Sequence, residues 1–236
     1  MPIELNLGFK DVSPIFWRNT YAQVQPLRRE METSLSTVES IARKNETLVA
    51  HKTGSISYAS MVSLFALGYC CRPRVIVEVG TYLGRSGLSL LLGARSGFAG
   101  IAEPRLFTCD MSANEAQFGA LKDQVTYFGK QKSTAMFAEL ARQGVKADLV
   151  FFDGRLQNED LPLLHQLLKL ETVYAFDDFE GNEKGVFNSE VVSKLLGGGL
   201  FIVYPPTLAD LAAFQVIGHS VVAVGLPPTA IKLTRQ

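Results

Sequence analysis

Short apolar segments alternate with segments of helical character through most of this 236-residue chain. The apolar segments have the length of strands, and most are separated by stretches of about a dozen residues. They read VIVEVG (75–80), RLFTCD (105–110), VTYFGK (125–130), DLVFFDG (148–154) and TVYAFDD (172–178). Connections of this length join parallel strands, and strands that are apolar throughout are buried on both faces. The pattern therefore predicts an α/β protein with a doubly wound, mostly parallel sheet.

The N-terminal region departs from this alternation. Residues 1–33 contain three prolines among scattered aromatic side chains, which favours an irregular arm or lid over a long helix. Residues 34–50 have apolar residues at helical spacing. We therefore expect an arm and one helix over residues 1–50, which form an N-terminal helical extension to a single domain spanning 51–236.

The C-terminal region carries two further apolar segments, 219–226 and 230–234. The link between them is too short for a crossover helix, so a parallel arrangement of these two segments is excluded. We expect an antiparallel hairpin at the edge of the sheet.

Composition limits the classes of partner. Lys plus Arg and Asp plus Glu both number 23, so the formal charge is zero and no basic stripe indicates a nucleic-acid binder. No apolar run reaches the length of a membrane span, and the N-terminal residues do not resemble a signal peptide, so we expect a cytoplasmic protein. The odd number of cysteines, Cys70, Cys71 and Cys109, indicates reduced thiols rather than a disulfide framework.

The first strand ends in an acidic residue followed by a glycine-rich turn, EVGTYLGRS (78–86). Ligands of open parallel sheets bind beyond the carboxyl ends of the strands, and Gly80 and Gly84 let a ligand approach the backbone there. A dinucleotide site would place the middle glycine of the fingerprint G-x-G-x-x-G where Tyr82 stands, and the negative charge of Glu78 suits a cationic ligand better than a pyrophosphate. A nicotinamide-dependent oxidoreductase on a similar sheet is the less favoured alternative.

This stretch resembles the first motif of class I S-adenosylmethionine (SAM)-dependent methyltransferases, in the E-x-G-x-x-x-G-x-S form of small-molecule O-methyltransferases. The segments CD (109–110), GKQKS (129–133), DLVFFDG and AFDD (175–178) follow in the order of that family. The resemblance implies a Rossmann-like sheet of seven strands and a SAM site at its carboxyl edge. It also implies an O-methyltransferase acting on a small hydroxylated molecule, with a natural-product intermediate as one expected class.

By this resemblance, Glu78 and Gly80 lie beside the methionine part of SAM, Ser86 lies near its carboxylate, and Asp110 accepts the ribose hydroxyls. Met111 then borders the adenine. The full set of expected cofactor-binding residues is Glu78, Gly80, Tyr82, Gly84, Ser86, Asp110, Met111, Ser133 and Asp153.

Asp153 ends one strand, and Asp177 and Asp178 end the next. Three carboxylates that converge with no basic residue near them would repel one another, and oxygen ligands of this kind suit Mg²⁺. The arrangement is similar to the metal site of the catechol, caffeoyl-coenzyme A and macrolide-sugar O-methyltransferases. The alternative is that Asp153 contacts the cofactor alone while the other two aspartates hydrogen-bond a turn.

The catalytic base is the least defined part of the expected site. Members of the resembled family often carry His or Lys after the fourth-strand aspartate, but Arg155 stands near that position here, and arginine does not deprotonate usefully. The remaining candidates are His51, Lys184 and His165, and we expect Asp153 and His51 to be the catalytic residues. A non-catalytic, methyltransferase-like binding protein stays open as an alternative, and the aromatic N-terminal arm suggests a homodimer.

Overall fold

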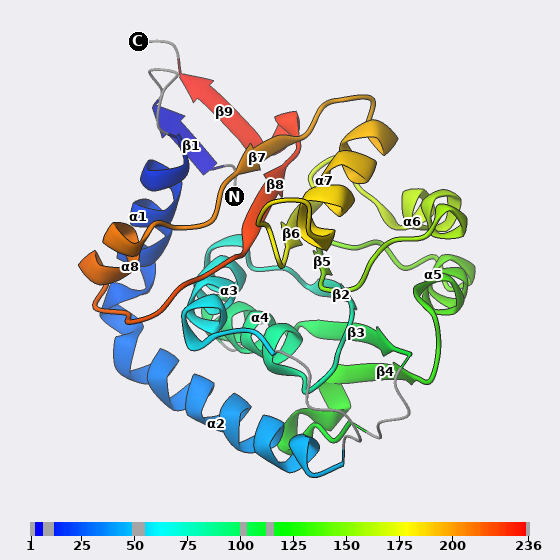
Figure 1. Ribbon diagram of the computed structural model, residues 1–236, viewed down its shortest axis with the longest axis horizontal. Helices are drawn as coiled ribbons and strands as arrows, with labels where there is room; N and C mark the ends of the chain where they lie inside the picture. Colours follow the sequence, from blue (N-terminus) through cyan, green and yellow to red (C-terminus); the bar gives the residue numbers. More distant parts are fainter. Residues whose placement is uncertain (1–2, 7–11, 49–54, 100–102, 112–115, 235–236) are drawn as a thin grey trace.

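The computed structural model describes residues 3–6, 12–48, 55–99, 103–111 and 116–234. A seven-stranded sheet runs through the molecule in the order β4-β3-β2-β5-β6-β8-β7, with all pairs parallel except β6–β8 and β7–β8 (Figure 1). Its strands are β2 (Val75–Val79), β3 (Arg105–Asp110), β4 (Val125–Gly129), β5 (Leu149–Phe152), β6 (Val173–Phe176), β7 (Phe201–Val203) and β8 (Ala223–Leu226). This architecture confirms the predicted doubly wound, mostly parallel sheet.

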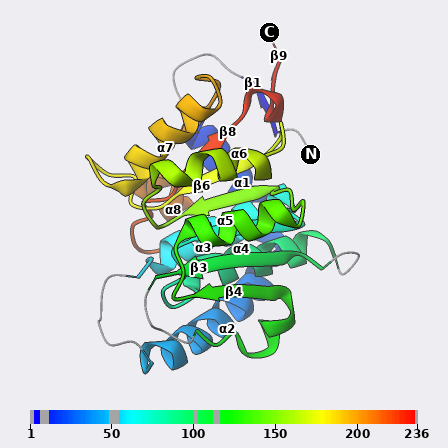
Figure 2. The same ribbon diagram turned by 90° about the vertical axis from the view of Figure 1, so that its right-hand side faces the viewer.

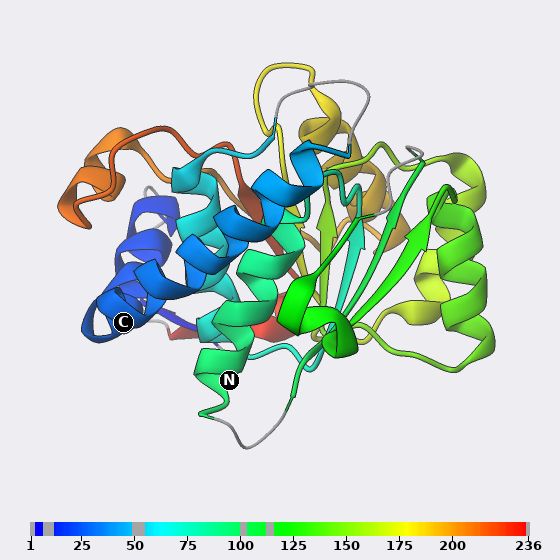
Figure 3. The same ribbon diagram turned by 90° about the horizontal axis from the view of Figure 1, so that it is seen from below.

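Helices cover both faces of the sheet, as Figures 2 and 3 show. One face packs against α1 (Val12–Val24), α2 (Arg28–Glu46), α3 (Tyr58–Cys71) and α4 (Arg85–Gly97). The other packs against α5 (Ser133–Arg142), α6 (Leu161–Leu167) and α7 (Lys184–Leu195). Successive strand residues point to opposite faces, so Ile76 belongs to the first core and Val77 to the second.

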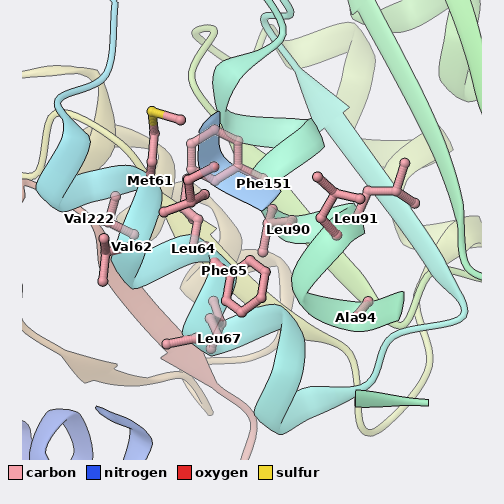
Figure 4. Close-up of a cluster of buried hydrophobic side chains, with 14 of the residues drawn as sticks. Met61, Val62, Leu64, Phe65, Leu67, Leu90, Leu91, Ala94, Phe151 and Val222 are labelled. Atoms are coloured by element: carbon pink, nitrogen blue, oxygen red, sulfur yellow. The ribbon is translucent and has the colours of Figure 1, made fainter. Parts of the chain in front are cut away.

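The helices α3 and α4 are in direct backbone contact. A β-carbon on Gly93 would lie 2.0 Å from the carbonyl oxygen of Phe65, and one on Gly68 would lie 2.3 Å from that of Leu90. Figure 4 shows the side chains of Phe65 and Leu90 beside Phe151 from the sheet. Glycine at these two positions lets α4 sit close against α3, which fixes where α4 begins at the end of β2.

The N-terminal residues form helices, which corrects the expectation of an irregular arm. After α1 and the 3-10 helix η1 (Gln25–Leu27), α2 starts at residue 28 rather than near residue 34. Pro14 lies in the first turn of α1 and Pro26 in η1, where a missing N–H is tolerated. Trp17 is fully buried and belongs to the same core as α3 and α4. The role of this N-terminal region as a lid stays a prediction.

The antiparallel pair near the C-terminus exists, but its members differ from those expected. The segment 219–226 contributes β8, which pairs with β7, while 230–234 contributes β9 (Ile231–Thr234). The strand β9 pairs in parallel with β1 (Ile3–Asn6) in a separate two-stranded sheet, so the described ends of the chain lie side by side (Figures 1 and 2). The short link excluded a parallel pairing of the two segments with each other, but it left each free to find another partner.

Three smaller elements complete the fold. The helix α8 (Leu208–Ala213) follows β7, and η3 (Asn158–Asp160) leads into α6. The 3-10 helix η2 (Gly119–Gln124) leads into β4. Among the described residues, no helix combines the length and apolar character that a membrane crossing requires.

Candidate active site

The sheet changes direction between β2 and β5. From β2 the chain proceeds outward through β3 to β4, and from β5 it proceeds the opposite way through β6. The loops that leave β2 and β5 therefore diverge and leave a crevice at the carboxyl ends of these strands, where open α/β sheets bind ligands.

The turn after β2 needs glycine at two positions. Gly80 has φ +97°, and a β-carbon there would lie 2.9 Å from the backbone nitrogen of Gly154 in the loop after β5. Gly84 has φ +83° and is the N-cap of α4. Both values lie in the left-handed region that glycine adopts without strain. The turn therefore passes directly over the start of the β5 loop.

Glu78 is fully buried beneath this turn. The hydroxyls of Ser86 and Thr108 donate to its two carboxylate oxygens at 2.5 and 2.6 Å. Burial raises the pKa of Glu78 to about 8, although these two hydrogen bonds favour the ionised form. The carboxylate thus ties the turn to α4 and β3.

This position differs from the one that the sequence suggested for Glu78 and Ser86. Glu78 points to the same face of the sheet as Ile76, toward α4, because side chains alternate along a strand. Gly87 makes room for it, since a β-carbon there would lie 2.4 Å from a Glu78 carboxylate oxygen. Both predicted side chains therefore support the turn from below instead of lining the cavity.

A cavity of about 420 Å³ lies at the carboxyl ends of β2, β3 and β5. Its wall contains four residues from the predicted cofactor-binding set, Gly80, Asp110, Met111 and Ser133, together with Gly154 of the β5 loop. A larger cavity of about 580 Å³ runs along α2 and is lined by Glu39, Arg43, Lys44 and Gln117, among others. We assign ligand binding to the smaller cavity because it contains the glycine turn and the strand ends.

Asp110 joins the two turns that border this cavity. Its Oδ2 accepts a hydrogen bond from the backbone N–H of Tyr82 at 2.6 Å. Tyr82 itself has φ +43°, in the left-handed region. Met111, the next residue after Asp110, is 70% exposed at the cavity wall. An acidic and an apolar group thus stand side by side at the end of β3.

Several residues around the cavity were not predicted. Gln131, Lys132, Arg155 and Gln157 also line it, and the guanidinium of Arg155 lies 4.5 Å from the ring centroid of Phe187. Gln131 and Lys132 lie in the segment GKQKS, and Arg155 was considered only as unsuited to act as the base, so none of the four was assigned to the cofactor site from the sequence.

Ser133 is held by a residue that the sequence analysis missed. It is the first residue of α5 and not its cap, and its hydroxyl donates to Oδ2 of the buried Asp160 at 2.8 Å. Asp160 also accepts from the Thr134 hydroxyl and from the backbone N–H of Gln157. The start of α5 is thereby fixed to the β5 loop. The spacing QNED (157–160), a capping box around η3, was the available signal.

Asp153, Asp177 and Asp178 converge beside the cavity, and we call them the carboxylate cluster. Phe152 and Phe176 are paired in the sheet, so the residues that follow them emerge together. One carboxylate oxygen from each aspartate lies within 4.8 Å of the other two. Burial, followed by the charges of the other two aspartates, raises the pKa of Asp177 to about 7. Oδ1 of Asp177 is buried and has no hydrogen-bond partner among the residues that the structure describes.

A basic residue does lie beside the carboxylate cluster, which corrects the expectation that none would. Nζ of Lys184 is 2.5 Å from Oδ1 of Asp153 and 3.0 Å from Oδ2 of Asp178. Burial works against the charge of the ammonium, but the two aspartates outweigh it and raise the pKa of Lys184. Lys184 is the first residue of α7, far from Asp153 in sequence.

The other candidate bases are not part of this arrangement. His51 lies outside the described residues. His165 is exposed on α6. Of the three candidates, Lys184 is the one that the described structure brings to the carboxylate cluster.

No family model matches the sequence, and no curated protein matches it at the level of sequence. Solved structures do share its fold. The O-methyltransferase TomG from Streptomyces achromogenes, involved in tomaymycin synthesis and solved in complex with SAM, is 18% identical with a TM-score of 0.55, covering 82% of this chain and 89% of its own. The O-methyltransferase from Bacillus cereus in complex with SAH is 19% identical with a TM-score of 0.56, covering 81% and 90%.

A third similar structure is a putative caffeoyl-CoA O-methyltransferase from Staphylococcus aureus. It is 14% identical with a TM-score of 0.51, and the match covers 88% of this chain and 98% of that one. These likenesses agree with the strand order and with the two layers of helices. The chain has the class I methyltransferase fold that its glycine-turn motif predicted.

Proposed function

We propose that this protein transfers a methyl group from SAM to a hydroxyl of a small molecule. The observation that carries the proposal is the cavity at the β2–β5 crevice, where Gly80 and Asp110 stand at the carboxyl ends of the neighbouring strands β2 and β3. Support also comes from the fold, since solved structures that share it include O-methyltransferases in complex with SAM and SAH.

The residues of the cavity fit SAM. Gly80 lines the cavity, and its lack of a side chain lets the turn pack closely on the β5 loop. The Asp110 carboxylate has two acceptor oxygens, of which Oδ2 already accepts from the Tyr82 N–H, and it suits the hydroxyls of a ribose. Met111 offers an apolar surface for the adenine. When bound, SAM supplies a methyl group on a positively charged sulfur.

The carboxylate cluster fits a Mg²⁺ ion. It offers three hard oxygen ligands within 4.8 Å of one another, and in the described part of the chain the buried Oδ1 of Asp177 has no other partner. Asp153, Asp177 and Asp178 would hold the ion. When bound, the ion chelates substrate oxygens and lowers the pKa of the attacking hydroxyl.

The two sites share one loop. Gly154 lines the cavity, while its neighbour Asp153 belongs to the carboxylate cluster. A hydroxyl held at the cluster would therefore lie next to the cavity that would hold the methyl donor. Methyl transfer is an in-line displacement, so this adjacency addresses its main requirement, the alignment of oxygen, carbon and sulfur. The expected substrate is a small hydroxylated molecule, and a cytoplasmic homodimer stays a prediction.

Titration calorimetry with SAM, SAH and NAD⁺ tests the proposal, with Asp110→Ala as the variant and Asp123→Ala, an exposed residue of η2, as the matched control. We expect SAM and SAH to bind, Asp110→Ala to weaken both, and Asp123→Ala and NAD⁺ to show no effect. Methyl transfer to a panel of catechols and other hydroxylated compounds follows. Binding of NAD⁺ in place of SAM would contradict the proposal. Binding of SAM without methyl transfer to any acceptor would favour the non-catalytic alternative.

A further inference from the structure

The carboxylate cluster carries its own cation. We propose that Lys184 is a built-in counter-cation of Asp153, Asp177 and Asp178, and that a divalent ion enters the cluster only by displacing its ammonium group. This inference rests on the proposed metal site and adds a device that controls its occupancy. The distances of 2.5 and 3.0 Å from Nζ to Asp153 and Asp178 are those of close ion pairs.

The backbone holds Lys184 at this place. A β-carbon on Gly185 would lie 2.1 Å from the carbonyl oxygen of Asp177 and 2.9 Å from the carbonyl carbon of Asp178. The first turn of α7 therefore packs directly on the turn that carries two of the three aspartates. Asp178 itself has φ +50°, a conformation that asparagine and aspartate tolerate better than most residues. The contact between Gly185 and this turn therefore holds Lys184 beside the cluster.

One ammonium leaves the cluster incompletely compensated. Lys184 makes ion pairs with Asp153 and Asp178, whereas Oδ1 of Asp177 is buried without a partner from any described residue. Three aspartates and one lysine carry a formal charge of −2 when all are ionised. A divalent ion would engage all three carboxylates, and it balances that remaining charge. The cluster therefore retains an oxygen that an ion would satisfy.

The ammonium and an ion cannot occupy the cluster together in this arrangement. Mg²⁺ binds oxygen at about 2.1 Å, so an ion bonded to Asp153 and Asp178 would take the space now held by Nζ, next to a like charge. The Lys184 side chain is 31% exposed, so it has an open path to solvent. Ion binding therefore includes the cost of breaking two ion pairs, and the apparent affinity for the ion is lowered by that cost.

Binding of Mn²⁺, followed by the electron paramagnetic resonance signal of the free ion, tests this inference without SAM or turnover. Lys184→Met removes the ammonium and keeps much of the side-chain length. The matched control is Lys194→Met, because Lys194 is an exposed lysine of the same helix. We expect Lys184→Met to bind Mn²⁺ at least about tenfold more tightly than the unmodified protein, and Lys194→Met to leave the affinity unchanged.

Two further variants make the result decisive. Asp177→Asn should weaken Mn²⁺ binding in the Lys184→Met background, which assigns the bound ion to the cluster. If Lys184→Met lowers the melting temperature, Lys184→Gln serves as a second variant, because it also removes the charge but keeps a polar side chain. Mn²⁺ affinity that is unchanged or weakened in both Lys184 variants, or the absence of binding in every protein, would overturn the inference. Failure of the methyltransferase proposal would instead appear as absent SAM binding, which this experiment does not use.

Discussion

The carboxylate of Asp110 accepts a hydrogen bond from the backbone N–H of Tyr82 at 2.6 Å, which joins the end of β3 to the glycine turn after β2. Asp110 thus has two roles, since it fixes the turn and presents a carboxylate to the cavity. A substitution that keeps the first role and weakens the second separates them.

Asp110→Asn is such a substitution, because the amide oxygen can still accept from the Tyr82 N–H. The side chain then lacks a second acceptor for the ribose hydroxyls, and the affinity for SAM should fall by roughly 10- to 100-fold. SAH should lose as much, since the ribose is common to both. Calorimetric titration measures each affinity, and an undiminished affinity would remove Asp110 from the cofactor site.

Glu78 should make stability depend on pH. Its pKa is raised to about 8 in the folded protein from an ordinary value of 4.5, so between these values the folded state binds more protons than the unfolded state. The contribution of Glu78 to the free energy of unfolding is therefore greatest below about pH 4.5, and it is lost as the pH rises toward 8.

Glu78→Gln cannot titrate and should lack this fall. The free energy of unfolding of the variant, relative to the unmodified protein, should therefore rise between pH 5 and pH 8.5 in urea titrations. Glu103→Gln, at an exposed position, serves as control and should show no such trend. A constant difference between Glu78→Gln and the unmodified protein across this range would count against the buried, protonated carboxyl.

Removal of divalent ions should lower methyl transfer. We expect a chelator to reduce turnover and added Mg²⁺ to restore it, because the substrate hydroxyl loses both its orientation and its acidification. Asp177→Asn should reproduce the loss while leaving SAM affinity within about twofold of the original, since Asp177 does not line the cofactor cavity. Turnover that is indifferent to both changes would exclude a role for the ion.

Gly185→Ala should destabilise the protein. The added methyl group would lie 2.1 Å from the Asp177 carbonyl oxygen, so α7 has to shift away from the carboxylate cluster. Overpacking of this kind costs about 1–3 kcal/mol, which a urea titration resolves. Gly199→Ala is the matched control, because the nearest atom to its β-carbon would be 3.5 Å away. Equal stability of the two variants would contradict the tight contact at the start of α7.

The strands and the glycine turn were predictable because their signals are local. A run of apolar residues gives a buried strand, and the positions of Gly80 and Gly84 give the turn. Asp153 and Asp177 were brought together by the same logic, since both follow directly on strands that were expected to be neighbours. Here sequence order and position in space agree.

The remaining features depend on how distant segments pack. Lys184 reaches Asp153 across 31 positions of sequence, and only the docking of α7 decides that contact. The pairing of β9 with β1 likewise joins the two ends of the chain, so no local rule at the C-terminus reveals it. Glu78 was misplaced for a simpler reason, because the end of a strand was taken to face the crevice when alternation turns that side chain toward α4.

Asp153 and Gly154 are consecutive residues that serve two adjoining sites, one at the carboxylate cluster and one at the cavity. A single peptide unit cannot shift for one ligand and stay still for the other. The two binding equilibria are then linked. If an ion at the cluster raises the affinity of the cavity for the nucleoside by some factor, the nucleoside raises the affinity of the cluster for the ion by the same factor.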